Sequence, residues 1–356
     1  MLFVSKEKDI INSKPGDLYF DRVKSFIDEW LTGSPYLEVQ TSGSTGPVKT
    51  IRLSREQIKA SVNQTARAFH LNEDSLFICN LNLDFIAGKL QIIRALELNA
   101  ELMIIHPSDD FTQALLPQRA VILRNYRRAF MAFVPLQLVK ILESPVGREL
   151  LNAAGAIILG GAAVSSALES EINQLNAPVY ATFGMTETVT HFAIKRLNGP
   201  EKDLHFTPLP DTEIGISKAG TLMVKNACTK NEWLITNDLV SIHQDGSFDI
   251  SGRADRVINS GGVKLSLDKM EQKIDRLLSL KSPFFCAALP DERLGQKLVL
   301  FIESDTDQSK LLPVLKENMS KFESPKQIIT LAHFDRTKTG KIDKLRTTHA
   351  YSVSDQ

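Results

Sequence analysis

The strongest constraint on the fold is an alternation along the chain between short apolar runs and segments with helical spacing. The apolar runs have the length of β-strands, and they are LFICNL, LMIIH, FMAFV, AIILG and VYATF. Apolar residues recur with helical spacing between or after these runs, at residues 88–98, 111–125, 136–144 and 165–175. Because parallel strands need long crossover connections and are buried on both faces, this alternation predicts an α/β fold with a mostly parallel sheet.

Two further signals place the elements that precede the first of these runs. Residues 20–31 carry apolar side chains at helical spacing, and residues 37–40 have the pattern of a short strand. Ser54 and Gln57 have the spacing of a capping box, in which the two side chains satisfy the first backbone N–H groups of a helix. The sequence therefore predicts a helix that begins after Ser54 and runs to about Phe69.

The pattern changes after about Pro200 to short strands separated by turn residues, which predicts a small antiparallel β region. Beyond Asp255, a hairpin, two helices and two strands are expected to form a small α+β unit of domain size. We therefore expect a large N-terminal domain at residues 1–254 and a small mobile domain at residues 255–356, with the hinge at Asp255.

Composition and charge argue against several classes of function. The chain has 42 basic and 42 acidic residues, so no net charge attracts nucleic acid or an anionic membrane. No segment approaches the ~20 apolar residues that span a bilayer, and the first residues lack the pattern of a signal peptide, so a cytoplasmic location is expected. The cysteines are widely spaced and are expected to pack in the core; they are Cys79, Cys228 and Cys286.

A loop rich in glycine and hydroxyl groups, TSGSTGPVK at residues 41–49, follows the strand predicted at residues 37–40. Glycine lets the backbone approach a ligand, while hydroxyls and a lysine supply donors for phosphate oxygens. A Walker A loop needs Gly directly before the Lys, and Val48 stands there. By itself the segment is also typical of a flexible surface turn. Its candidate ligand contacts are Thr41, Ser42, Gly43, Ser44, Thr45, Gly46 and Lys49.

This loop resembles the phosphate loop of the adenylate-forming acyl-CoA synthetases, and other motifs of that family follow in the family's order. Residues 180–188, YATFGMTET, resemble the segment that packs on adenine and places a carboxylate on Mg²⁺. The resemblance assigns Phe183 and Gly184 to the nucleotide site. It implies that Thr186 contacts phosphate and that Glu187 binds the metal, for which a carboxylate is a suitable hard ligand. The alternative is that Glu187 caps a turn.

Two motifs imply contacts with the ribose. Residues 236–238, Thr-Asn-Asp, take the place of the family's TGD, whose Asp binds the ribose hydroxyls. Residues 251–256, SGRADR, resemble the GRxD segment, which implies that Arg253 reaches ribose or phosphate and that Asp255 is the interdomain hinge. Without the resemblance, Asp238 is equally well a turn residue and Arg253 a surface charge.

The last two motifs lie in the C-terminal region. A Ser-Gly-Gly stretch resembles the loop that lines the pantetheine tunnel during thiol transfer, although the residues after it depart from the usual family pattern; it comprises Ser260, Gly261 and Gly262. Residues 336–342, RTKTGKI, match the signature whose last lysine bridges the substrate carboxylate and the α-phosphate. This match implies that Lys341 is catalytic, because an ammonium can stabilise charge on both groups.

Two segments indicate which carboxylic acid is the substrate. FVPLQL at residues 133–138 and ILGGAAV at residues 158–164 resemble segments common in o-succinylbenzoate-CoA ligases of menaquinone synthesis, which places Gly160 and Gly161 at the substrate pocket. An acid with two carboxylates needs one cation besides the catalytic lysine. That cation is expected on the helix at residues 88–98.

Lys89 and Arg94 are the two candidates for this second cation. Residues 82–89, NLDFIAGK, take the place of a family stretch in which a histidine stands where this chain has Phe85. The alternative is that Lys89 only covers a helix end with its aliphatic stem.

Together the motifs predict an ATP-dependent ligase that joins a small carboxylic acid to CoA through an acyl-adenylate, with ATP, Mg²⁺ and CoA as cofactors. Two alternatives stay open: a ligase for another acid, including a loader of carrier proteins, and a catalytically silent nucleotide-binding protein. The second is motivated by length, because family members usually carry a longer segment before the phosphate loop, so we expect a shortened start of the large domain. The sequence does not indicate an oligomeric state.

Overall fold

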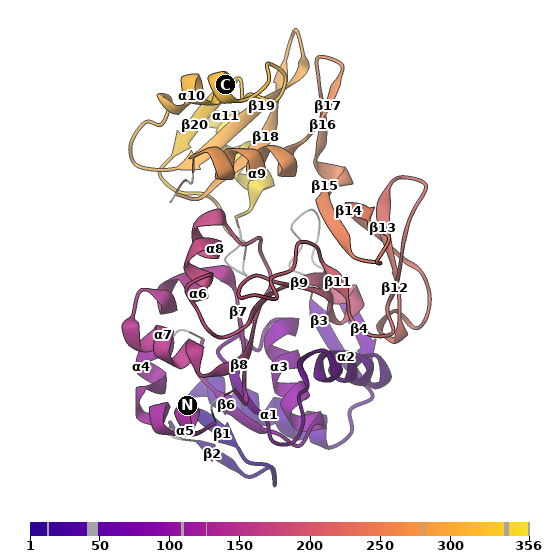
Figure 1. The fold of residues 1–356 in the computed structure, drawn as a ribbon, viewed down its shortest axis with the longest axis vertical. Coiled ribbons are helices and arrows are strands. Elements are labelled where there is room, and N and C mark those ends of the chain that lie inside the picture. The colour runs from indigo at the N-terminus through magenta and orange to yellow at the C-terminus, as the bar shows by residue number, and fades with distance from the viewer. Residues whose placement is uncertain are drawn as a thin grey trace.

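The protein contains a large α/β part, a small antiparallel sheet beside it, and a C-terminal part that combines helices with a further sheet (Figure 1). This arrangement confirms the predicted fold class. The computed structural model describes residues 1–12, 14–40, 49–107, 110–125, 127–278, 280, 282–337 and 342–354.

The largest sheet among these residues has nine strands in the order β11-β10-β9-β8-β7-β5-β6-β1-β2. Its five central strands, β9 to β6 in that order, run parallel, as predicted from the five apolar runs. The strands at both edges pair antiparallel. The strands are β1 (Leu2–Val4), β2 (Ile10–Asn12), β5 (Leu76–Cys79), β6 (Glu101–Ile104), β7 (Ala129–Phe133), β8 (Ala154–Leu159), β9 (Val179–Met185), β10 (Thr190–Arg196) and β11 (Thr207–Pro208).

Helices cover both faces of this sheet. Successive residues of a strand point to opposite sides, so each strand supplies side chains to two separate cores. In β5, Phe77 and Cys79 enter the core formed with α1, α2 and α3, whereas Leu76 and Ile78 enter the core formed with α4 to α8. Burial on both faces explains why β5, β7 and β8 are continuously apolar. The helices are α1 (Leu18–Leu31), α2 (Arg55–Phe69), α3 (Ile86–Glu97), α4 (Phe111–Leu115), α5 (Arg119–Arg124), α6 (Pro135–Leu142), α7 (Pro145–Asn152) and α8 (Ser166–Ile172).

The predicted helices are present, with one interruption. The capping box at the start of α2 is formed: Ser54 Oγ accepts from the Gln57 N–H at 3.3 Å, and the Gln57 side chain accepts from the Ser54 N–H at 3.0 Å. The segment predicted as one helix at residues 111–125 is instead two short helices around a 3-10 turn, η1 (Leu116–Gln118). Pro117 explains this break, because proline has no N–H to donate.

The small sheet predicted after Pro200 is present and packs against the end of the large sheet. An aromatic cluster joins the two sheets, and it consists of Phe183, Phe192, Phe206 and Phe248. The ring centre of Phe183 lies 5.8 Å from that of Phe206 and 5.9 Å from that of Phe248. The small sheet has the order β12 (Glu213–Ile216), β13 (Thr221–Lys225), β14 (Leu234–Ile242) and β15 (Phe248–Arg253).

The C-terminal part follows β15 after the 3-10 turn η4 (Ala254–Arg256). Helices α9 and α10 pack on one face of its sheet around Ile274 and Leu315, and α11 covers the other face, where Tyr351 contacts Phe301. The boundary at Asp255 stays a prediction. The elements are β16 (Val257–Ser260), β17 (Val263–Ser266), α9 (Leu267–Leu278), β18 (Phe284–Asp291), β19 (Gly295–Glu303), α10 (Leu311–Asn318), β20 (Gln327–Leu331) and α11 (Lys344–Ser354).

Candidate active site

The carboxyl ends of the parallel strands form one edge of the large sheet. In the sheet order, β6 lies on one side of the adjacent pair β5 and β7, and β8 lies on the other, so the connections after β5 and β7 leave in opposite directions there. In open α/β sheets, ligands bind in the crevice outside such a divergence. Asn80 follows β5 at this edge; it is 5% exposed, and its Oδ1 has no hydrogen-bond partner among the described residues. A ligand donor at this edge would satisfy that buried acceptor.

Gly160 and Gly161, predicted to lie at the substrate pocket, follow β8 at the same edge. A Cβ atom on Gly160 would lie 2.8 Å from the Oγ1 of Thr182 in β9, too close for a side chain without a shift. Gly161 has a φ of +87°, a conformation that favours glycine. At the edge between β8 and β9, the backbone of Gly160 therefore packs directly against the Thr182 side chain.

Thr186 and Glu187 follow β9 and lie in the 3-10 turn η2 (Thr186–Thr188). The cap of this turn is Thr188, whose hydroxyl accepts from the Met185 N–H at 3.0 Å. Glu187 is half-buried, and no side chain of the described residues forms a hydrogen bond or ion pair with its carboxylate. Its oxygens are therefore available to a ligand or a hard cation.

The backbone that follows Glu187 is strained. Val189 has a φ of +52° and Thr190 a φ of +77°, a region that β-branched residues rarely adopt. Ser61 Oγ holds the turn by donating to the Val189 carbonyl at 2.8 Å. Such conformations cost ~1–3 kcal/mol each and collect at functional sites. The sequence carried no signal for the positive φ angles of Val189 and Thr190, because two consecutive β-branched residues favour an extended strand.

Phe183 and Gly184 precede this turn in β9. Phe183 belongs to the aromatic cluster, so it links the predicted nucleotide site to the small sheet. A Cβ atom on Gly184 would lie 2.0 Å from the carbonyl oxygen of Thr190, which no side chain can tolerate. Glycine is thus required here by the close approach of β9 and β10.

Arg94 of α3 lies beside the strained turn. Its Nη2 donates to Thr190 Oγ1 at 2.8 Å, its side chain is almost fully buried, and its Nε has no partner among the described residues. Burial lowers its pKa to about 10, and the groups that oppose this shift are Cys228 and Cys79 rather than a carboxylate. Arg94 is therefore a buried cation that contacts Thr190, and no acidic side chain of the described residues neutralises its charge.

Lys89 lies in a different environment from Arg94. Its Nζ donates to the carbonyl oxygen of Glu38 in β3 (Tyr36–Gln40) at 3.2 Å and lies 5.9 Å from the ring centre of Phe26 in α1. Burial lowers its pKa. Five residues correspond to about 140° around a helix, so Lys89 and Arg94 lie on different faces of α3.

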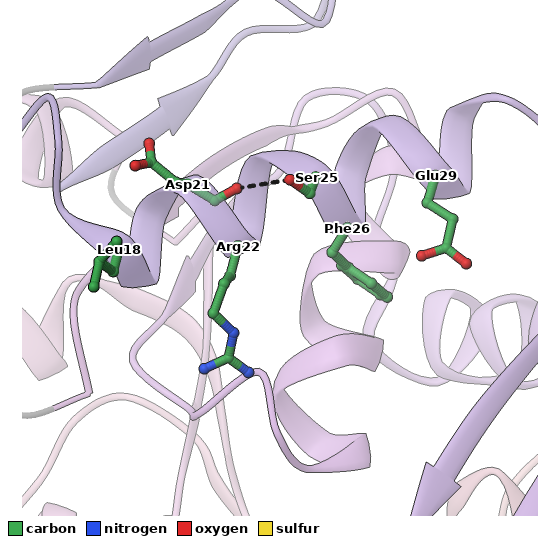
Figure 2. Close-up of a pocket in the computed structure, with 6 residues that line it drawn as sticks. All are labelled: Leu18, Asp21, Arg22, Ser25, Phe26 and Glu29. Atoms are coloured by element: carbon green, nitrogen blue, oxygen red, sulfur yellow. Dashed lines mark hydrogen bonds between the residues drawn. The ribbon is translucent and has the colours of Figure 1, made fainter.

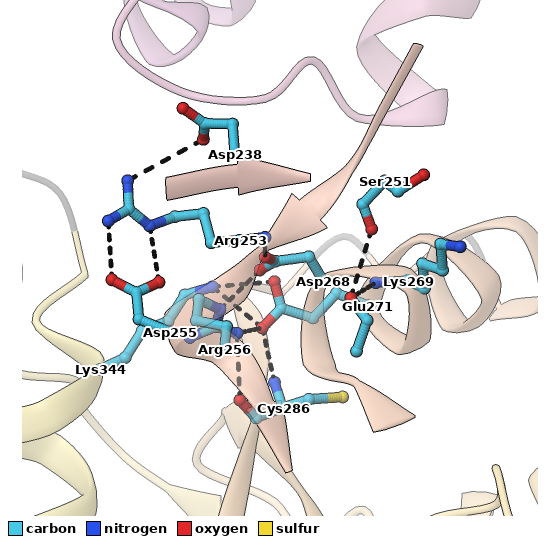
Figure 3. A network of polar contacts seen from close by, with 11 residues as sticks. Asp238, Ser251, Arg253, Asp255, Arg256, Asp268, Lys269, Glu271, Cys286 and Lys344 are labelled. Atoms are coloured by element: carbon cyan, nitrogen blue, oxygen red, sulfur yellow. Dashed lines mark hydrogen bonds and ion pairs between the residues drawn. The ribbon is translucent and has the colours of Figure 1, made fainter. Parts of the chain in front are cut away.

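Asp238 and Arg253 are opposite each other in β14 and β15. Burial raises the pKa of Asp238, and the nearest Arg253 nitrogen lies 3.9 Å from its carboxylate. The Arg253 guanidinium donates to both oxygens of Asp255, at 2.9 and 2.7 Å (Figure 3). The three predicted residues therefore form one chain of charges at the end of the small sheet.

The predicted residues of the last two motifs lie elsewhere or are not described. Ser260, Gly261 and Gly262 lie at the turn of the β16–β17 hairpin, which extends away from the large sheet (Figure 1). Lys341 lies outside the described residues, and so do Thr41 to Gly46. The flanking strands β3 and β4 (Thr50–Ser54) pair antiparallel, and Lys49 is exposed just before β4.

A shallow depression of about 510 Å³ lies on the outer face of α1, and one of its lining residues, Phe26, is the residue whose ring lies 5.9 Å from the Lys89 ammonium (Figure 2). Its lining comes from one helix, so it is open surface and not an enclosed site. The lining residues are Leu18, Asp21, Arg22, Ser25, Phe26 and Glu29.

Comparison with known proteins places the chain in a family. The profile of the AMP-binding enzyme family matches residues 33–226. A solved structure of an acyl-CoA synthetase (AMP-forming)/AMP-acid ligase II-like protein from Dyadobacter fermentans is 37% identical, with a TM-score of 0.63, over 98% of this chain and 99% of that chain. The chain therefore belongs to the AMP-binding enzymes, the adenylate-forming family that contains the acyl-CoA synthetases.

Two further relatives carry a more specific description. The 2-succinylbenzoate–CoA ligase of Staphylococcus aureus strain MSSA476 is 27% identical over 331 residues, which cover 85% of this chain and 65% of the relative. This chain thus spans about two thirds of that protein. The o-succinylbenzoate coenzyme A synthetase from Bacillus subtilis, solved with ATP and magnesium, has the same fold, with a TM-score of 0.72 at 20% identity over 87% of this chain and 69% of that chain.

Across the described parts of the chain, every helix is too short or too polar to cross a bilayer.

Proposed function

We propose that the protein is an ATP-dependent, AMP-forming ligase that converts a carboxylic acid into a thioester of CoA. The observation that carries this proposal is the position of Glu187. Its carboxylate, which no side chain of the described residues contacts, lies just before strained backbone at the carboxyl edge of the parallel sheet, in a chain that belongs to the AMP-binding enzymes.

In the first half-reaction, the substrate carboxylate attacks the α-phosphorus of ATP, a carboxyl O–P bond forms, and pyrophosphate leaves. The ribose hydroxyls donate hydrogen bonds to the two carboxylate oxygens of Asp238, and Arg253 adds a positive charge beside it. Thr186 and the 41–49 loop bind phosphate oxygens, while Lys341 stabilises the charge shared by the carboxylate and the α-phosphate.

The residues at the sheet edge fit a magnesium ion. Mg²⁺ binds through one or two carboxylates together with substrate phosphates, and Glu187 offers one carboxylate without a competing partner among the described side chains. When bound, the ion neutralises charge on the phosphate oxygens.

In the second half-reaction, the thiol of CoA attacks the acyl carbonyl, a C–S bond forms, and AMP leaves with the electrons of the broken C–O bond. Rotation at Asp255 exchanges the Lys341 segment for the hairpin that carries Ser260 to Gly262. The outward direction of this hairpin supports such an exchange, because it does not line the sheet edge in the present conformation (Figure 1).

The substrate we propose is o-succinylbenzoate, and two features support it. Relatives over most of this chain carry that activity in their names. Arg94 is a buried cation without an acidic partner among the described residues, and it donates to Thr190, three positions after Glu187, where it can meet the second carboxylate of a diacid. Lys89 is the less suitable candidate because it already contacts Glu38 and Phe26.

Pyrophosphate release measured with a panel of acids, with and without CoA, tests the proposal. We expect single-turnover release without CoA, multiple turnovers with CoA, and a preference for o-succinylbenzoate over benzoate and medium-chain fatty acids. A faster monoacid would overturn the substrate but not the reaction class. Pyrophosphate without any CoA thioester would indicate a carrier-protein loader, and ATP binding without pyrophosphate from any acid would indicate a silent nucleotide-binding protein.

A further inference from the structure

Three side chains with metal-ligating atoms meet on the small antiparallel sheet, and none of them belongs to the site described above. They are His205, His243 and Asp249, and their ligand atoms all lie within 4.8 Å of one another. His205 Nδ1 lies 2.9 Å from one oxygen of Asp249, and His243 Nε2 lies 3.0 Å from the other. The two imidazole ring centres are 3.9 Å apart.

The backbone of the sheet holds these side chains together. Phe206 and Phe248 exchange two backbone hydrogen bonds of 2.9 Å, which places His205 directly across from Asp249. The His243 N–H donates to the carbonyl of Ser247 at 2.8 Å in the turn from β14 to β15. The cluster is therefore positioned by paired strands, which are more rigid than a free loop.

The cluster lies on the solvent side of the sheet. Neighbouring strand residues point to opposite faces, so Phe248 enters the aromatic cluster while Asp249 points the other way. The three side chains are 32%, 37% and 45% exposed, which leaves room for water as a further ligand.

The ligand types and spacing fit a transition metal. Imidazole nitrogen with one carboxylate oxygen is a donor set used by Zn²⁺, whereas Mg²⁺ and Ca²⁺ prefer oxygen ligands alone. Ligand atoms around a tetrahedral Zn²⁺ are about 3.3 Å apart, given bond lengths of about 2.0–2.1 Å. The observed separations reach at most 4.8 Å, so side-chain shifts of about an ångström complete the geometry.

We propose that His205, His243 and Asp249 bind one divalent transition-metal ion such as Zn²⁺. The ion would link His205 to His243, in the turn from β14 to β15, and to Asp249 in β15. It would lie on the face of the small sheet opposite the aromatic cluster that contains Phe183. The site is separate from the magnesium site proposed at Glu187 and does not depend on the proposed ligase activity.

Equilibrium dialysis of the untagged, chelator-treated full chain with Zn²⁺ and no nucleotide tests the site. We expect one ion per chain, no displacement by excess Mg²⁺, and a higher melting temperature with the ion present, because it binds the folded state. His243→Gln and Asp249→Asn should each raise the dissociation constant at least about tenfold. His349→Gln, at an exposed histidine of α11, is the matched control and should leave it unchanged.

Two results would overturn the proposal: no saturable Zn²⁺ binding by the unmodified chain, or the same affinity in both site variants. If a variant does not fold, Co²⁺ bound to the unmodified protein decides the question. A weak tetrahedral visible spectrum supports nitrogen and oxygen ligands, whereas an intense thiolate band would assign the ion to a cysteine and overturn the site.

Discussion

Arg94→Met is expected to make the protein more stable and, at the same time, a poorer ligase for a dicarboxylic acid. The two effects share one cause, which is a buried positive charge that no acidic side chain of the described residues neutralises. Methionine is unbranched and uncharged, so it keeps the apolar stem of the side chain but removes both the cost of burying the cation and the contact that the cation offers to a ligand.

The size of the stability effect follows from the pKa. Burial lowers the pKa of Arg94 to about 10, so between pH 10 and the higher value of the unfolded chain the unfolded state binds more protons. Stability from this group therefore rises with pH in that window, and below it the buried charge costs about 3 kcal/mol. The hydrogen bond lost to Thr190 is worth about 1 kcal/mol, which leaves a net gain of about 2 kcal/mol at neutral pH.

The effect on activity should depend on the acid. A charge-assisted contact is worth about 1.5 to 3 kcal/mol, so kcat/KM for o-succinylbenzoate should fall about 10- to 150-fold. The value for benzoate, which has no second carboxylate, should change little. Lys89→Met is the matched control. It removes a cation from the same helix, but this cation already donates to the carbonyl oxygen of Glu38.

Thermal melting and steady-state kinetics with both acids provide the measurements. A lower melting temperature for Arg94→Met, together with equal losses for both acids, would show that Arg94 only supports the Thr190 turn. If Lys89→Met instead lowers kcat/KM for o-succinylbenzoate but not for benzoate, the second carboxylate binds on the other side of α3.

Three further predictions concern the catalytic cycle. Lys341→Ala should abolish pyrophosphate release but spare ATP binding and thioester formation from presynthesised acyl-AMP; equal loss of both half-reactions would contradict its role. Asp255→Pro should spare single-turnover pyrophosphate release and block thioester formation, while Asp255→Ala, which also loses the Arg253 ion pair, should still form thioester. Glu187→Gln should raise the Mg²⁺ concentration needed for half-maximal adenylation by roughly tenfold at an unchanged melting temperature, and an unchanged Mg²⁺ requirement would place the ion elsewhere.

Much of the fold was predictable because its signals are local. The central strands β5, β7 and β8 are apolar throughout since both faces are covered, and the capping box at Ser54 and Gln57 depends on residues three positions apart. The order of the motifs was likewise readable along the chain and pointed to the family that the comparison confirmed. Local signals failed at Pro117, where a helical pattern continued through a residue that breaks the helix.

The tertiary structure decided what depends on distant residues. Lys89 and Arg94 were equal candidates in the sequence, and only the packing of α3 places one at β3 and the other at the turn after Glu187. The positive φ angles of Val189 and Thr190 run against the preference of β-branched residues, so only surrounding contacts can hold them. His205 and Asp249 are 44 positions apart in the chain, and strand pairing alone brings them together.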